Sequence, residues 1–189
     1  FFDMENLTEL LVKVKSVREL MGLNEYPVYC KIGPDHTDEE ICQMIDIMHT
    51  YGINGILTCN LTVKRELIPD DDKVTYVIHG GKIEKRVMPD DRGGLSGHIL
   101  RPMTNHIIKV CGQHVKDNEY KFIVIGIGGC DTAEDAYLKI RSGATLIHLI
   151  TGMIFHGPQI SAEINIGLVE LLRRDGYNNI SEAIGVDLR

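Results

Sequence analysis

The sequence predicts an α/β fold built around a parallel β-sheet. Short, almost continuously apolar segments alternate with longer segments in which apolar residues recur at helical spacing. Parallel strands must be joined by crossovers, and the intervening segments have the length and pattern of crossover helices. The order is one helix followed by four β–α units. This is half of a (β/α)₈ barrel or, alternatively, a small doubly wound sheet, and the pattern leaves both open.

The elements of the first third follow from local spacing and capping. Apolar residues at helical spacing predict a helix over 7–20, and the apolar segment 27–32 predicts a strand. Thr37 and Glu40, three residues apart, form a capping box that begins an amphipathic helix. A second strand is predicted over 53–59.

The remaining β–α units are predicted from the same patterns. The sequence predicts helices over 97–112 and 131–142, strands over 122–125 and 144–149, and a final helix over 157–174. The apolar segment 122–125 is the clearest buried strand of the chain.

The segment 64–92 interrupts this alternation and is predicted to be an insertion in the single domain 1–189. Apolar residues alternate with polar ones on both sides of Gly80–Gly81, which predicts a hairpin with a two-residue turn. A solvated insertion is the favoured interpretation. A lid over a site is the alternative, because long loops in compact domains are often functional.

Composition excludes several classes of protein. The chain has 189 residues, 43% of them apolar, and its formal charge is 20 − 27 = −7. These values indicate a globular domain and argue against a nucleic-acid partner, which would call for a basic surface. No apolar segment reaches the roughly 18 residues that cross a bilayer. The sequence therefore predicts a globular domain without a nucleic-acid partner or a transmembrane segment.

The spacing of the cysteines and histidines does not predict a metal site. The five cysteines contain no C-x-x-C pair, so neither a zinc site nor a disulfide framework is expected, and a reduced compartment is the simplest interpretation. His106 and His114 could share a helix face, but no third ligand has a supporting spacing.

The carboxyl ends of the strands are where a parallel α/β fold binds its ligand. Gly126, Gly128 and Gly129 follow one strand and precede a capped helix, so backbone N–H groups can approach an anion there. Thr151–Gly152 ends the next strand. Loops from two adjacent strands would converge, which favours a phosphate-type site over glycines that serve only tight turns.

Three further features stand at the same edge. Lys31 is the only charged residue of its strand; it could hold a ligand charge or extend its ammonium to water. Asn60 could bind a planar polar substrate or cap a turn. The run Gly93–Gly97 could bring backbone close to a ligand, or Ser96 could be an N-cap.

Four segments of the chain together resemble one enzyme family. The runs at 93–97, 125–129, 139–144 and 182–189 are similar to the C-terminal half of dihydroorotate dehydrogenase, and 95–97 and 182–189 resemble its class 2, quinone-dependent branch. The resemblance implies a (β/α)₈ TIM barrel of which this chain supplies the last four βα units. It further implies the cofactor FMN and oxidation of dihydroorotate to orotate, in pyrimidine synthesis, with a quinone as acceptor.

The resemblance also implies roles for individual residues. Lys31 would contact the flavin ring, where its charge stabilises the reduced, anionic flavin. Asn60 would hydrogen-bond dihydroorotate or orotate, with Leu61 beside it. The other residues expected at the FMN site are Cys59, Gly97, Gly128, Gly129, Ile150 and Thr151.

The chain departs from the family pattern at three of these positions. The family usually has Thr at the position of Cys59, a hydroxylic residue at that of Leu61 and Tyr at that of Ile150. Each change is expected to weaken a side-chain hydrogen bond and to leave backbone contacts available. Leu61 is expected to alter substrate binding most. The insertion 64–92 is also longer than the family's usual loop.

Other parts of the family pattern would precede residue 1. They are the serine that acts as catalytic base, an early FMN-binding loop, and the N-terminal helices that form the quinone tunnel and touch the membrane. We therefore expect this chain to be a piece of a longer polypeptide, located by resemblance at the mitochondrial inner membrane. The alternative is a non-catalytic half-barrel that binds a phosphate or flavin without the base.

Overall fold

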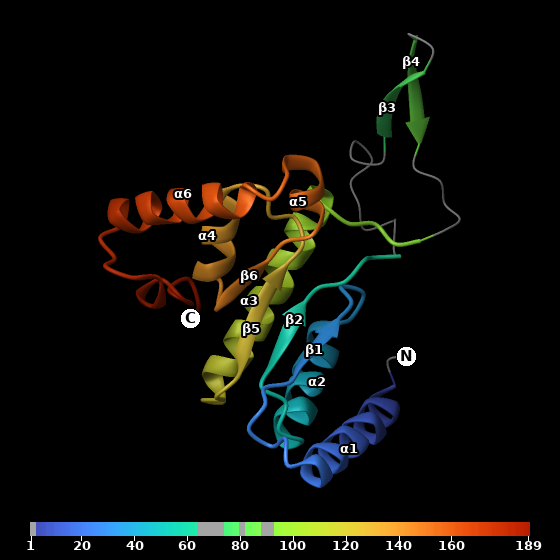
Figure 1. Ribbon diagram of the computed structural model, residues 1–189, viewed down its shortest axis with the longest axis vertical. Coiled ribbons are helices and arrows are strands. Elements are labelled where there is room, and N and C mark those ends of the chain that lie inside the picture. Colours follow the sequence, from blue (N-terminus) through green and yellow to red (C-terminus); the bar gives the residue numbers. More distant parts are fainter. Residues whose placement is uncertain (1–2, 64–73, 80–81, 88–92) are drawn as a thin grey trace.

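The computed structural model describes residues 3–63, 74–79, 82–87 and 93–189 (Figure 1). In chain order the elements are α1 Met4–Met21, β1 Tyr29–Ile32, α2 Asp38–Thr50, β2 Gly55–Thr58, β3 Val74–His79, β4 Lys82–Val87, the 3₁₀ helix η3 His98–Leu100, α3 Arg101–Asp117, β5 Ile123–Ile127, α4 Ala133–Arg141, β6 Leu146–His148, α5 Thr151–His156, α6 Ile160–Arg174 and the 3₁₀ helix η4 Ile180–Glu182. The predicted order of one helix and four β–α units is confirmed.

The four predicted strands form one parallel sheet in the order β1-β2-β5-β6. Lys31 stands opposite Leu57, Leu57 opposite Ile125, and Ile125 opposite Leu146. Since all four strands run the same way, their carboxyl ends lie at one edge of the sheet (Figure 1).

Helices cover one face of this sheet. Alternate strand residues, including Ile32, Ile56 and Val124, are buried in a core with α1, α2 and α3. Ile147 of β6 contacts both this core and the second one, between α4 and α6, so both helix groups pack on the same face. A doubly wound sheet has helices on both faces, whereas a barrel has them only outside. The arrangement is therefore that of a barrel segment.

The opposite face lacks such a cover in the described part of the chain. Tyr29 is 37% exposed and Leu146 54% exposed, and Leu57 and Ile125 between them are only partly buried. In a closed barrel this face is the packed interior.

Local capping explains where the predicted helices begin. Thr37 accepts from the Glu40 amide while the Glu40 carboxylate accepts from the Thr37 amide, as the capping box predicts. Thr132 and Asp135 form a second capping box at the start of α4.

Two predicted helices have different bounds. The segment 97–112 begins with η3 and continues as α3 to Asp117, with Pro102 in its first turn. The final helix of 157–174 is preceded by the additional short α5, and Gly157, at φ 84°, separates α5 from α6.

Within the insertion, β3 and β4 pair antiparallel from Val74↔Val87 to His79↔Lys82, as the alternation predicts. The turn Gly80–Gly81 lies outside the described residues, as do 64–73 and 88–92. Both interpretations of the insertion, solvated or lid, stay predictions.

The histidines considered as metal ligands have structural partners. On α3, His106 Nε2 lies 2.8 Å from an Asp38 oxygen and His114 Nε2 lies 2.7 Å from an Asp46 oxygen, both on α2. Among the described residues no three His, Cys, Asp or Glu side chains gather as a metal site, and all five cysteines are free. No helix in the described ranges is long and apolar enough to span a membrane.

The uncovered sheet face gives a first prediction. Because its apolar side chains lack a cover in the described part of the chain, the 189-residue chain expressed alone is expected to enhance the fluorescence of the dye ANS and to self-associate in sedimentation velocity. Leu146→Lys, on the β6 edge of this face, should reduce both, whereas Leu138→Lys, on an exposed surface of α4, should not. A monomer that binds no dye would contradict this account of the face.

Candidate functional site

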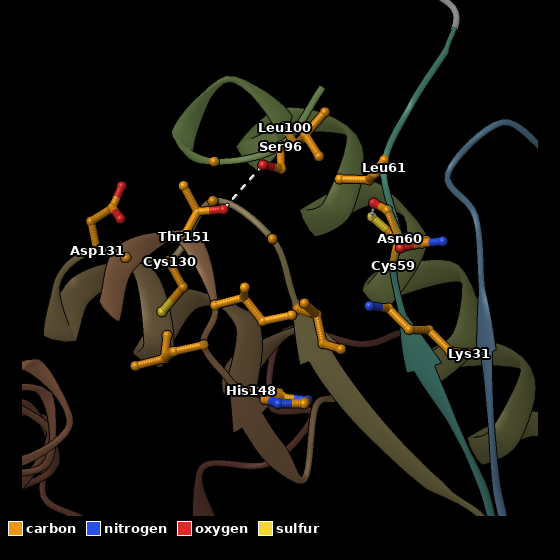
Figure 2. Close-up of a pocket in the computed structure, with 17 residues that line it drawn as sticks. Lys31, Cys59, Asn60, Leu61, Ser96, Leu100, Cys130, Asp131, His148 and Thr151 are labelled. Carbon is orange, nitrogen blue, oxygen red and sulfur yellow. Dashed lines mark hydrogen bonds between the residues drawn. The ribbon is translucent and has the colours of Figure 1, made fainter. Parts of the chain in front are cut away.

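A pocket lies at the carboxyl edge of the sheet, as the parallel topology predicts (Figure 2). It is formed by the ends of β1, β2, β5 and β6 together with the loop 93–97. The structure brings all nine predicted site residues into its wall: Lys31, Cys59, Asn60, Leu61, Gly97, Gly128, Gly129, Ile150 and Thr151. Their grouping from separate parts of the chain supports the predicted site.

Lys31 contributes a positive charge to the pocket. It is the third residue of β1 and belongs to the set that faces away from the helices, so its side chain is exposed on the open face. Figure 2 shows its ammonium directed toward Cys59 and Asn60. The side chain therefore extends into the pocket and not outward to bulk water beyond it.

The segment after β2 forms the next part of the wall. Cys59 is buried, and burial raises the pKa of its thiol to about 12, although Lys139 and Lys31 oppose this effect. A thiol with this pKa is neutral at physiological pH and is no nucleophile. Asn60 follows with its amide donating to the Ile32 carbonyl at 2.7 Å, which fixes the backbone.

Leu61 is held under the loop 93–97. Thr62 and Leu95 pair as a two-bond antiparallel bridge, with N···O distances of 3.2 and 2.9 Å. A Cβ on Gly94 would lie 2.2 Å from the Leu61 Cβ, so only glycine permits this approach. Leu61 remains 44% exposed toward the pocket opening, where the family's hydroxylic residue would stand.

The turn after β5 lies tightly against α3. Gly128 and Gly129 have φ of 94° and 60°, in the left-handed region that favours glycine. A Cβ on Gly128 would lie 2.7 Å from Thr104 Cγ2, and one on Gly129 would lie 2.7 Å from the Arg101 backbone. Both glycines are thus required for close packing as well as for the turn.

The turn's carbonyl groups are directed to α3. Thr104 Oγ1 donates to the Gly128 carbonyl at 2.9 Å, and Arg101 Nε donates to the Gly129 carbonyl at 3.1 Å. In the described part of the chain, no hydrogen bond uses the backbone amides of Gly128, Gly129 or Cys130. These amides remain available to an anion in the pocket.

The start of α5 faces the same space. Ile150 is its N-cap residue and offers no side-chain cap, and the described residues provide no partner for the amides of Thr151 and Gly152. Ser96 Oγ and Thr151 Oγ1 lie 3.1 Å apart (Figure 2), which joins the loop 93–97 to α5. Loop amides and the first turn of a short extra helix form the phosphate sites of many barrels.

Sequence reasoning missed several lining residues and one contact. His148 is exposed on the open face of β6, two residues beyond Leu146, and strand alternation could have placed it there. Ser96 is not an N-cap, because Gly97 is the N-cap residue of η3. The Ser96 hydroxyl instead contacts Thr151, 55 residues further along the chain. The other lining residues not predicted are Leu100, Ile127, Cys130, Asp131 and Leu149.

Comparisons with known proteins identify the family of this chain. The family model described as dihydroorotate dehydrogenase matches residues 2–172. A dihydroorotate dehydrogenase (quinone) of Nautilia profundicola is 36% identical over 90% of this chain and 42% of that protein. One of Thermobifida fusca is 34% identical over 97% of this chain and 45% of that protein. The chain thus spans less than half the length of these relatives.

Solved structures show the same fold. A crystal structure of DHODH from Eimeria tenella in complex with ferulenol superposes with a TM-score of 0.69 at 30% identity, covering 85% of this chain and 38% of the other. The ligand-free form from the same organism gives a TM-score of 0.68. The predicted partial (β/α)₈ barrel is confirmed. This chain belongs to the dihydroorotate dehydrogenase family.

Proposed function

We propose that this chain supplies the FMN-binding half of an enzyme that oxidises dihydroorotate to orotate with a quinone as electron acceptor. The observation that carries the proposal is the pocket itself, in which unpaired loop amides lie at one end and Lys31 and Asn60 at the other. The family and the quinone-type names of the relatives favour this proposal over a non-catalytic half-barrel.

The residues present fit the phosphate and ring of FMN. The amides of Gly128, Gly129 and Thr151 would hold the phosphate, because these residues line the pocket and their amides have no partner in the described structure. A side chain on either glycine would collide with α3. Lys31 would place its charge beside the flavin ring, where it favours a negatively charged ring system.

Asn60 and Leu61 would form the substrate side of the pocket. A carboxamide both donates and accepts hydrogen bonds, which matches the alternating N–H and C=O groups of a cyclic ureide such as dihydroorotate. FMN, when bound, would accept the hydride. The chain's own residues bind and orient, while the proton acceptor is the serine that the resemblance places before residue 1, which stays a prediction.

The remaining expectations concern location and partners. The curated relatives are from bacteria and archaea, and they do not support a mitochondrial location, which rests on the class 2 resemblance alone. Quinone access and membrane contact through N-terminal helices also stay predictions.

Replacing Lys31 tests the electrostatic role. In the full-length protein, Lys31→Ala is expected to slow flavin reduction by dihydroorotate by about 10²-fold or more, because the charge that favours the reduced ring is lost. Stopped-flow absorbance of the bound flavin measures this rate. The matched control is Lys15→Ala, on the exposed surface of α1. Unchanged reduction in a Lys31→Ala protein that retains its flavin would exclude the role.

Replacing Leu61 tests whether this residue lies on the substrate side of the pocket. Leu61→Thr restores a hydroxyl at the pocket opening, and one added hydrogen bond of about 0.5–1.5 kcal/mol should lower the KM for dihydroorotate about threefold to tenfold. Steady-state kinetics at fixed quinone measures it, with Val63→Thr, two residues along and 66% exposed, as the control. An unchanged or higher KM would show that this side chain does not face the substrate.

A further inference from the structure

A lysine with no assigned role lies fully buried below the phosphate end of the pocket. Lys139 of α4 has no exposed surface. Its ammonium donates to Thr104 Oγ1 at 2.9 Å and to Asn105 Oδ1 at 2.6 Å, both on α3. Among the described residues, no carboxylate lies within ion-pair distance of its nitrogen. A buried cation without a direct counter-ion is costly, so its position calls for an explanation.

Thr104 connects this ammonium to the glycine turn. Its hydroxyl accepts from Lys139 and donates to the Gly128 carbonyl at 2.9 Å, the nearer of two acceptors, since the Arg101 carbonyl lies 3.2 Å away. Because the accepted bond comes from a charged donor, it polarises the hydroxyl and strengthens the bond that the hydroxyl donates. The Gly128 carbonyl is thus held toward α3, and because this peptide is trans and planar, its amide, that of Gly129, points to the opposite side of the turn.

The charge of Lys139 also reaches the pocket wall. Burial raises the pKa of the Cys130 thiol to about 12, and Lys139 opposes this rise, as it does at Cys59. Both thiols line the pocket. A charge that acts on two wall residues in a poorly solvated region will act on an anion bound between them.

A second cation is already neutralised and cannot take this role. Arg101 lies 2.9 Å from an Asp135 oxygen and 3.6 Å from an Asp131 oxygen. Its field toward the pocket is therefore largely cancelled. Lys139 is the cation near the turn that lacks a directly bonded carboxylate in the described part of the chain.

We propose that Lys139 is a positioning residue for the FMN phosphate: it fixes Thr104 against the Gly128 carbonyl and supplies a buried positive charge behind the amides that bind the phosphate. The proposal rests on the proposed function for the identity of the ligand. It assigns to Lys139 a contribution to phosphate affinity and none to the flavin ring.

The protonation state of Lys139 is compatible with this role. Burial lowers its pKa to about 8, opposed by Cys130, Asp135 and Cys59 and assisted by Arg101. The ammonium is therefore mainly charged at pH 7 and loses its proton as the pH rises through about 8. The FMN phosphate, with a second pKa of about 6, keeps its charge over that interval.

The test compares FMN with riboflavin, which has the same ring and no phosphate. Binding of each to the full-length apoprotein is followed by quenching of flavin fluorescence. Lys139→Met, of similar length and neutral, is expected to weaken FMN about tenfold and riboflavin little, so the ratio of their affinities falls. Lys109→Met, on the exposed side of α3, is the control and should keep the ratio.

The wild-type protein provides a test that needs no variant. Its preference for FMN over riboflavin should fall as the pH rises from 7 to 9, and this fall should be absent in Lys139→Met. If both flavins weaken equally in the variant, Lys139 only stabilises the fold, and the proposal is overturned. A pH-independent preference in the wild type also contradicts it. If the wild type binds neither flavin, the proposed function fails and this inference with it.

Discussion

Parallel pairing of four strands is the constraint on which the rest of the structure depends. Because β1, β2, β5 and β6 run the same way, residues from position 31 to position 151 meet at one edge. The sheet forms a barrel segment in which α1, α2, α3, α4 and α6 cover one face, and in the described part of the chain the carboxyl edge holds the pocket. The predicted site residues at the strand ends lie in the pocket for this reason, and the Thr62–Leu95 bridge adds the loop that carries Gly97.

The phosphate end of the pocket links packing to binding. Gly128 and Gly129 lie so close to α3 that no side chain fits, and the same contact directs their carbonyl groups to Thr104 and Arg101. Because these two carbonyls point toward α3, the amides of the same peptides point away from it. Successive free amides of this kind form an anion-binding turn. The buried Lys139 lies beneath this contact, where its desolvation lowers stability and its charge favours a bound anion. A cost to the fold and a gain in affinity thus arise from one side chain.

Local patterns predicted the parts of the structure that depend on neighbouring residues. The capping box of Thr37 and Glu40 and the buried strand near Phe122 require no distant partner, and both are present. The short α5 was missed because its apolar residues after β6 resemble a continuing strand until Gly157 and Pro158. Contacts between residues far apart in the sequence could not be predicted either. A lysine in an amphipathic helix normally lies at the surface, and only the packing of α4 on α3 buries Lys139.

The central claim is that this edge of the half-barrel holds FMN, phosphate at the glycine turn and ring beside Lys31. The most direct measurement is a crystal structure of the full-length protein with FMN bound. Our account predicts phosphate oxygens within hydrogen-bond distance of the amides of Gly129 and Thr151, with the Lys31 ammonium against the flavin ring. Density for FMN outside this pocket, or a phosphate held away from both loops, would contradict it.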